Sequence, residues 1–232
     1  MISTTASLPP VSATPARRRG RPRKADAAAL SIEQLLEASA EIFARDGYEG
    51  VSLRKLQREL GVSYTFFHHY FDSKEALWKA VVDQLAGETT SRVLAALTRI
   101  DESHDEFDAL QEAIRIYLRS AIEHPAIQLI CLQEAISGGP RLDYIYKCYF
   151  EGAWALIAEM VARVERSGRI KPVPVESLFF AVQSALAPLL QRPFYEKLTG
   201  QSRNPTRHPA ADKPEQYIQQ SIDLLFHGWC KP

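Results

Sequence analysis

The sequence has no long apolar run and few cysteines, which excludes several classes of protein. No part of its 232 residues approaches the roughly 18 apolar residues of a membrane span, and no basic start precedes the apolar run of a secretory signal. Cys131, Cys148 and Cys230 are scattered and have no Cys-x-x-Cys spacing, so neither a disulfide framework nor a zinc site is indicated. We therefore expect a cytoplasmic protein with no membrane partner, no metal and no cofactor.

The common signatures of catalytic sites are also missing. The chain contains no glycine-rich phosphate loop, no His-Glu-x-x-His, no Gly-x-Ser-x-Gly and no cluster of carboxylates on an apolar face. His104 and Asp105 fall in a polar stretch, where solvated side chains are expected. We predict that the protein is not an enzyme and assign no catalytic residue.

Acidic residues are absent from the first 24 residues, although the chain as a whole is neutral. Six of the 28 basic residues lie in this segment, which leaves 22 basic against 28 acidic residues, a net charge of −6, in the rest. A basic arm of this kind attracts phosphate. Within it, Arg19-Gly20-Arg21-Pro22 is similar to the core of an AT-hook, whose arginines enter a narrow minor groove. A solvated tail that adds non-specific affinity explains the same residues, and both interpretations place Arg19 and Arg21 on DNA.

The segment from Ser52 to Ser63 has the pattern of a helix-turn-helix. Leu53, Leu56 and Leu60 are spaced to line one face of a short helix. Gly61 can adopt a positive φ at the turn, and the Ser63 hydroxyl can cap a second helix. Two helices joined in this way present the second helix to the major groove of DNA. We therefore predict a protein that binds double-stranded DNA.

The flanks of this segment supply the rest of a small helical head. Ser31-Ile32-Glu33-Gln34 is typical of a capping box, and the helix that it begins is expected to end at Gly47. On the other side, Asp72 or Ser73 can cap a further helix whose apolar face includes Leu77 and Trp78. Three short helices then share one core, and the fourth leads out of it.

These residues together resemble the TetR family of bacterial transcription regulators. The resemblance spans roughly residues 30–78, a fifth of the chain, and rests on Phe43 to Tyr48, Val51 to Arg54, Gly61 to Ser63 and His69 to Leu77. It implies a three-helix DNA-binding head, an all-helical regulatory body with a small-molecule pocket, and a homodimer on a palindromic operator. The chain departs from the family pattern at Gln57, where a small residue is more usual, and at Tyr64 to His68 in the recognition helix.

We expect the DNA contacts to come from the head. Tyr64 and Thr65 begin the recognition helix and are assigned to bases or thymine methyl groups. The expected phosphate contacts are foremost Lys74, which follows the cap of its helix, together with Ser52, Arg54, His68, His69 and Tyr70, while Ser63 lies at the turn. The two histidines are alternatively ordinary, partly buried helix residues, and a metal site is disfavoured because adjacent residues on a helix point in different directions.

The fold class that we predict is all-α. The basic arm occupies residues 1–24, the head 25–75 and a helical ligand-binding and dimerisation body 76–232. Proline and glycine positions divide the body into helices near residues 73–98, 107–123, 126–137, 140–167, 174–191 and 214–228, with a kink and restart expected near Pro188 and Pro193. The helix over 140–167 is apolar on nearly every side, so we predict that it is central.

Two sets of apolar residues in the body are assigned to function. Leu110, Ile114, Tyr117, Phe150 and Trp154 are expected to line a cavity for a small apolar or aromatic effector, although each aromatic taken singly is more often plain core. Phe179, Val182, Leu186, Ile218, Ile222 and Leu225 are expected at the interface of an isologous dimer.

The function that we predict is that of a repressor controlled by this effector. The effector is expected to tilt the helix that begins at Ser73 and so to change the separation of the two heads. The alternative is an architectural or protein-regulated DNA-binding dimer with a filled core and no small ligand.

Overall fold

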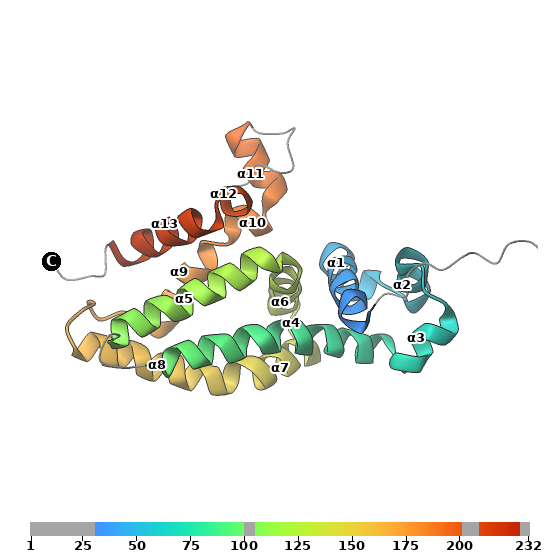
Figure 1. The fold of residues 1–232 in the computed structure, drawn as a ribbon, viewed down its shortest axis with the longest axis horizontal. Helices are drawn as coiled ribbons and strands as arrows, with labels where there is room; N and C mark the ends of the chain where they lie inside the picture. The colour runs from blue at the N-terminus through green and yellow to red at the C-terminus, as the bar shows by residue number, and fades with distance from the viewer. Residues whose placement is uncertain (1–30, 100–104, 201–208, 228–232) are drawn as a thin grey trace, which may run out of the picture. The chain divides into compact units, whose positions relative to one another are not determined.

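The computed structural model describes residues 31–99, 105–200 and 209–227, and this part of the chain is helical with no β-strand. The head consists of α1 (Ile32–Gly50), α2 (Leu53–Leu60) and α3 (Tyr64–Tyr70), and α4 (Lys74–Leu97) leads from it into the body (Figure 1). The body contains α5 (Glu106–Glu123), α6 (Pro125–Ser137), α7 (Pro140–Ile145), the π-helix η1 (Tyr146–Phe150), α8 (Glu151–Arg166), α9 (Val175–Ser184), α10 (Ala187–Leu190), α11 (Arg192–Thr199), α12 (Pro209–Asp212) and α13 (Pro214–His227). The predicted all-α fold is confirmed.

Local signals in the sequence determine where the helices of the head begin and end. Ser31 and Gln34 form the predicted capping box at the start of α1, and regular helix breaks at Gly47, which has a φ of 69°. The Ser52 and Ser63 hydroxyls cap α2 and α3 by accepting from the backbone amides of Lys55 and Phe66. Gly61 ends α2 at a φ of 68°, a left-handed conformation that favours glycine.

The core of the head brings together one apolar residue or more from each of its helices and from α4. Leu35, Phe43, Leu56, Phe67 and Leu77 are all essentially inaccessible to solvent. This arrangement fixes the angle of α3 against α2 and therefore determines which side of α3 remains exposed.

Gln57 of α2 departs from this apolar packing, because its amide nitrogen is buried and has no hydrogen-bond partner among the described residues. Replacing Gln57 with methionine keeps the length of the side chain and removes the unsatisfied amide. We expect the free energy of unfolding to rise by about 1 kcal/mol, as measured by urea denaturation. Gln57→Glu is the matched control and is expected to be destabilising. A methionine variant less stable than the parent would contradict this prediction.

The core of the body is formed mainly by α4, α5, α8, α9 and α13. Leu118, Val164, Leu186 and Ile218 are completely buried in it. In Figure 1, α4 and α5 run alongside each other, with α8 next to them. Because α4 also contributes Leu77 and Trp78 to the packing around the head, a single helix belongs to both parts of the structure.

The prediction of a central helix over residues 140–167 is wrong. The segment is divided into α7, η1 and α8, and Leu156 and Tyr146 are 47% and 50% exposed. Only one face of α8 is buried, through Ala153, Met160, Val161 and Val164. The π-helix explains part of the error, since its wider turn shifts the later residues around the axis relative to a regular helix.

The final helices differ from the sequence-based expectation in their divisions. The expected helix over 174–191 is interrupted between α9 and α10, and α11 restarts after it, as predicted near Pro193. The short α12 was not predicted. Among the described residues, none of the helices is long and apolar enough to cross a membrane.

Candidate DNA-binding surface and ligand cavity

The structure leaves much of the outer side of the helix-turn-helix exposed. Ser52 and Arg54 at the start of α2, and Ser63 and Thr65 at the start of α3, are exposed. So are His69 and Tyr70 at the end of α3, whereas His68 is half-buried. The other side of α3 packs Phe67 into the core. The exposed side of the helix-turn-helix is therefore free to contact a groove of DNA.

Some of the predicted DNA contacts lie outside the described residues. This is the case for Arg19 and Arg21 in the basic arm, and for the side chain of Tyr64, whose backbone forms the first residue of α3. Their assignment to DNA stays a prediction from the sequence.

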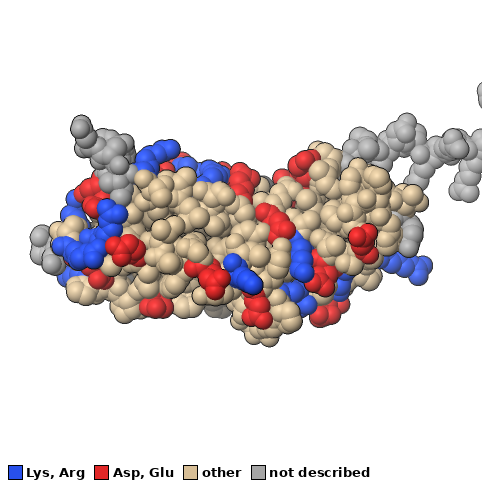
Figure 2. Space-filling view, turned by 90° about the horizontal axis from the view of Figure 1, so that it is seen from below, with Lys and Arg blue, Asp and Glu red and all other residues tan. Residues whose placement is uncertain are grey.

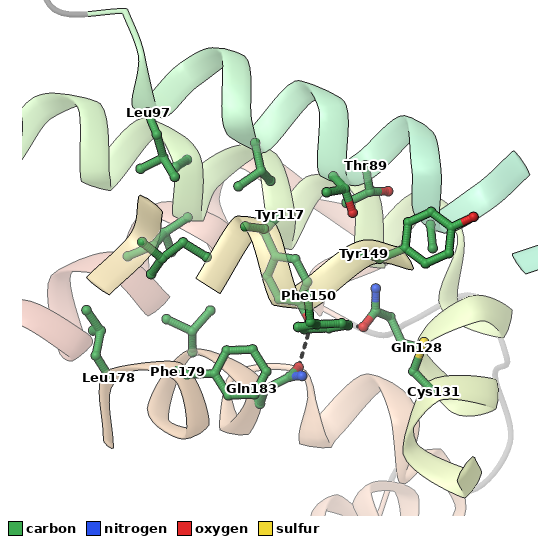
Figure 3. Close-up of a pocket in the computed structure, with 18 of the residues that line it drawn as sticks. Thr89, Leu97, Tyr117, Gln128, Cys131, Tyr149, Phe150, Leu178, Phe179 and Gln183 are labelled. Carbon is green, nitrogen blue, oxygen red and sulfur yellow. Dashed lines mark hydrogen bonds between the residues drawn. The ribbon is translucent and has the colours of Figure 1, made fainter. Parts of the chain in front are cut away.

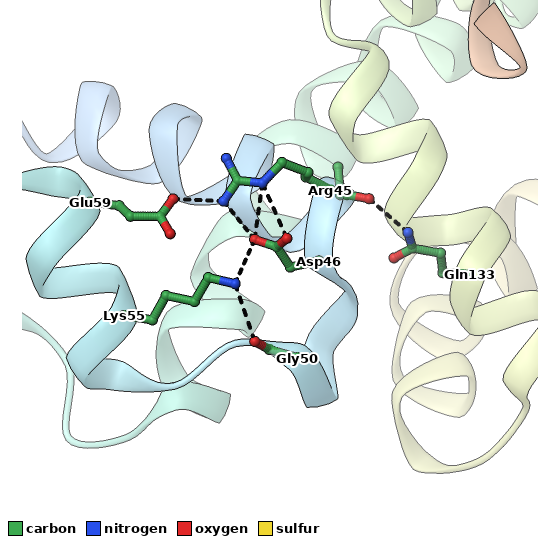
Figure 4. A network of polar contacts seen from close by, with 7 residues as sticks. Arg45, Asp46, Gly50, Lys55, Glu59 and Gln133 are labelled. Carbon is green, nitrogen blue, oxygen red and sulfur yellow. Dashed lines mark hydrogen bonds and ion pairs between the residues drawn. The ribbon is translucent and has the colours of Figure 1, made fainter. Parts of the chain in front are cut away.

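Basic side chains in the head are partly neutralised by acidic neighbours. Arg45 contacts Asp46 and Glu59, each at 2.6 Å, and Lys55 lies 3.0 Å from Asp46 (Figure 4). Hydrogen bonds from Arg45, and after it from Lys55, lower the pKa of Asp46 to about 2. This network joins α1 to α2. It holds Arg45 and Lys55 at the joint, which leaves Arg54 and Arg58 as the exposed cations of α2.

Lys74 has a partner inside the protein that the sequence did not suggest. Its Nζ donates to the backbone oxygen of Tyr48 at 3.0 Å and lies 3.9 Å from the centre of the Tyr48 ring. The Arg141 guanidinium lies 4.0 Å from the centre of the same ring. Lys74 therefore connects α4 to α1. Its expected contact with phosphate stays a prediction from the sequence.

The charged residues on the face drawn in Figure 2 do not form a field of one sign. Lysine and arginine are interspersed there with aspartate and glutamate. This distribution agrees with a chain that has 28 residues of each sign. Long-range attraction of phosphate to this face is weak, because opposite charges close together cancel at a distance.

The body contains a partly open cavity of about 150 Å³ between its helices (Figure 3). Leu110, Ile114, Tyr117 and Phe150 line it, as the sequence predicted. Trp154 is not among the lining residues. It packs against Phe179, which does line the cavity, with ring centres 5.5 Å apart. The main polar group of the cavity consists of Tyr117 from α5 and two glutamines from neighbouring helices.

This polar group is centred on Tyr117. Its hydroxyl oxygen lies 2.9 Å from the side-chain oxygen of Gln128 on α6 and 2.5 Å from that of Gln183 on α9. Burial raises the pKa of Tyr117 well above its usual range, so the phenol stays protonated and can donate. Sequence analysis did not predict Gln128 or Gln183. The available signal was weak: each is a single polar residue in an apolar stretch of helix.

The predicted dimer residues fall mostly in the core of the single chain. Val182, Leu186, Ile218 and Ile222 are buried, and Val182 and Phe179 line the cavity. These four buried side chains hold the protomer together and offer no free surface to a partner. The exposed apolar residues on the same helices are Phe180 on α9, 68% exposed, and Leu224 on α13, 79% exposed.

Helix α6 contacts both the cavity and the head. Ile127, Gln128 and Cys131 line the cavity. Little more than a turn from Gln128, Gln133 donates to the backbone oxygen of Ala44 in α1 at 2.7 Å (Figure 4). The neighbouring Glu134 is buried and accepts from Arg141 at 2.9 Å. A shift of α6 at the cavity therefore changes a contact with α1.

Comparisons with known proteins agree with this architecture. A family model described as bacterial regulatory proteins, tetR family, matches residues 35–81. The chain is 31% identical over 200 residues to the HTH-type transcriptional regulatory protein RaaS of Mycobacterium tuberculosis, and the match covers 84% of each protein. It is 29% identical over 164 residues to the HTH-type transcriptional regulator RutR of Escherichia coli K12, covering 69% of this chain and 74% of RutR.

The fold is shared with solved structures of such regulators. The ketosteroid transcriptional regulator KstR2 of Mycobacterium tuberculosis matches with a TM-score of 0.68 at 18% identity, over 86% of this chain and 95% of KstR2. The relatives, the family model and the helix-turn-helix geometry all point to the same assignment. The chain belongs to the TetR family of bacterial regulatory proteins and is a DNA-binding transcriptional regulator, not an enzyme.

Proposed function

We propose that the protein is a repressor that binds a palindromic operator as a homodimer and is released from it by a small uncharged effector. The observation that carries this proposal is the position of α4. Its first residues pack with the head through Trp78, and its later residues Thr89, Thr90 and Val93 line the cavity. An effector that fits one position of α4 better than another shifts the balance between two orientations of the head.

Recognition of the operator is assigned to α3 and the start of α2. Thr65 is exposed at the start of α3, where the recognition helix of a helix-turn-helix meets the base edges. Arg54 is exposed at the start of α2, and a guanidinium there is suited to a phosphate. The recognition helix α3 contains no lysine or arginine. We therefore assign the phosphate contacts largely to α2, to the histidines of α3 and to the basic arm.

Substitutions at these two positions are expected to act differently. Thr65→Ala removes a methyl and a hydroxyl group from the base-reading end, so we expect about a fivefold change in preference at one base pair. Arg54→Ala is expected to weaken binding to all DNA sequences alike. It is also expected to reduce the slope of log K against log salt concentration by about 0.9. Fluorescence anisotropy with a selected operator and its single-base variants measures both effects. Unchanged specificity in Thr65→Ala would remove this residue from base recognition.

The homodimer is assigned to the outward sides of α9 and α13. These helices are joined in the chain by a hydrogen bond from the Tyr217 hydroxyl to the Ala185 oxygen, and they expose Phe180 and Leu224. Two copies related by a two-fold axis would place their recognition helices about one turn of DNA, roughly 34–36 Å, apart or a multiple of it.

Sedimentation measures the dimer directly. We expect a dimer at micromolar concentration for the parent chain, and dissociation at least tenfold easier for the double variant Phe180→Asp, Leu224→Asp, because two buried charges would be unpaired. Leu132→Asp on α6, which replaces another exposed apolar residue, is the matched control and is expected to remain dimeric. A monomeric parent chain would contradict the dimer.

The cavity favours the effector-controlled repressor over an architectural protein with a filled core. A filled core would leave no space beside Tyr117, whereas the structure has a cavity of about 150 Å³ there. This volume corresponds to about five water molecules, at about 30 Å³ for each in the liquid.

A further inference from the structure

The lining of the cavity contains no charged side chain among the described residues. Its polar members are Thr89, Thr90, Tyr117, Gln128, Cys131, Tyr149 and Gln183. Transfer of an ionised group into such surroundings costs far more than transfer of a neutral one, unless an opposite charge is present. The cavity therefore discriminates against carboxylates and amines.

Most of these polar groups are already engaged by the protein. Thr89 lies 2.5 Å from the Ser120 hydroxyl and donates or accepts there, and the Tyr149 hydroxyl donates to Asp83 at 2.5 Å. The thiol of Cys131 is a weak donor, and burial raises its pKa to about 12. The Thr90 hydroxyl and the side-chain amides of Gln128 and Gln183 are the strong hydrogen-bonding groups that remain, and the two amides lie together at Tyr117.

The hydrogen bonds around Tyr117 show which groups of Gln128 and Gln183 remain free to bind a ligand. A phenol has one proton, so it cannot donate to both amide oxygens, although each lies within hydrogen-bond distance. One of the two amides must present its NH₂ group to the phenol oxygen instead. In the described part of the chain, no other hydrogen bond uses the side-chain amides of Gln128 and Gln183. Unused amide hydrogens therefore remain at the cavity.

Aromatic rings lie next to this polar group. Phe150 and Phe179 have ring centres 6.0 Å apart and nearly perpendicular planes, and both line the cavity. Figure 3 shows Phe150 beside the hydrogen bond between Tyr117 and Gln183. Perpendicular rings offer a face and an edge to a third ring, an arrangement that aromatic groups favour.

We propose that the effector is an uncharged, mainly aromatic molecule with one hydrogen-bond-accepting oxygen, a ketone or hydroxyl, held by the amides of Gln128 and Gln183. This inference rests on the proposed function and specifies the ligand of the same cavity. A cavity of about 150 Å³ is the size that accepts one aromatic ring such as benzene. Because the cavity is not fully enclosed, a second ring can extend toward its opening.

Three probes with a common biphenyl body test this ligand class: 4-acetylbiphenyl, biphenyl and biphenyl-4-carboxylate. Binding to the full chain is measured by calorimetry without DNA. We expect the ketone to bind about three- to tenfold more tightly than biphenyl, the value of one hydrogen bond, and at least tenfold more tightly than the carboxylate. The double variant Gln128→Leu, Gln183→Leu is expected to lose the preference for the ketone while it still binds biphenyl, which shows that it is folded.

A matched control is Gln216→Leu on the exposed surface of α13, which is expected to keep the preference. Equal binding of ketone and carboxylate, a preference that survives in the double variant, or no binding of any probe would overturn the proposed ligand class. DNA release is measured separately on a bound operator. A ketone that binds as expected but leaves the operator occupied would contradict effector control and leave the ligand class standing.

Discussion

Replacing Trp78 with alanine is expected to lower the free energy of unfolding by about 3–5 kcal/mol. Trp78 is 1% exposed and lies on α4 where this helix passes from the head to the body. Its ring centre lies 6.1 Å from that of Tyr48 on α1 and 6.2 Å from that of Tyr144 on α7. Removal of the indole leaves a cavity bordered by both parts of the structure, so neither part can easily close over it.

Urea denaturation followed by circular dichroism measures this loss. Trp154→Ala is a matched control, because Trp154 is the same residue type but half-buried, and we expect its loss to be clearly smaller. Trp78→Phe retains most of the buried area and is expected to fall between the two. An alanine variant at position 78 no less stable than the one at 154 would contradict the view that α4 is anchored at this point.

The same substitution is expected to affect regulation in the molecules that remain folded. The head depends on α4 for its orientation, and Tyr48 is held from α4 by Lys74 and from α7 by Arg141. Loss of the indole loosens this joint, so a shift of α4 at the cavity would reach the head less effectively. Coupling between effector and operator is thus expected to decrease more than affinity for either.

The head could be predicted from the sequence because its signals are local. The hydroxyls of Ser31, Ser52 and Ser63 each accept from a backbone amide three residues ahead. Glycine is favoured at position 61 because the φ of that residue is positive. Such features depend on neighbours within one turn of helix. The cap residues and the helix breaks therefore agree with expectations from the sequence alone.

The parts of the site that could not be predicted depend on residues far apart in the chain. Lys74 and Tyr48 are 26 residues apart, and Tyr117 and Gln183 are 66 apart. No periodicity within one helix shows which residues on another helix will face it. The same limitation explains why most residues predicted at the dimer interface lie in the core of the single chain. An apolar stripe on α13 fits a partner subunit as well as it fits α5 of the same chain.

The prediction of a central helix over residues 140–167 was wrong for a different reason. Its apolar residues are numerous enough to suggest burial on all sides, but Tyr146 and Leu156 are exposed. An apolar residue on the surface is common, so a count of such residues overestimates burial. The π-helix also brings Tyr149 to α4, where it lies against Gly87 and donates to Asp83. Sequence patterns based on 3.6 residues per turn do not show that placement.

Deleting residues 1–24 is expected to weaken operator binding about a hundredfold at 0.15 M salt and to flatten its salt dependence. The segment carries six basic residues and no acidic one, while much of the basic charge of the head is engaged within the protein, as in Arg45 and Lys55. Each phosphate contact contributes about 0.9 to the slope of log K against log salt concentration. Three contacts from the arm would lower the slope by about 2.7, which corresponds to the hundredfold loss, and six would lower it by about 5.

Charge and chain length are separated by a full-length variant in which the six basic residues are replaced by glutamine. This variant is expected to match the deletion, because counterion release depends on charge and not on the presence of the chain. Two double variants then distinguish the AT-hook from a non-specific tail: Arg19→Gln with Arg21→Gln, and Arg17→Gln with Arg18→Gln. Insertion into a narrow minor groove requires the first pair to cost more on A·T-rich flanks, whereas a tail makes the pairs equal. A deletion that left both affinity and slope unchanged would remove the arm from DNA binding, and the cations of α2 would then have to supply the phosphate contacts.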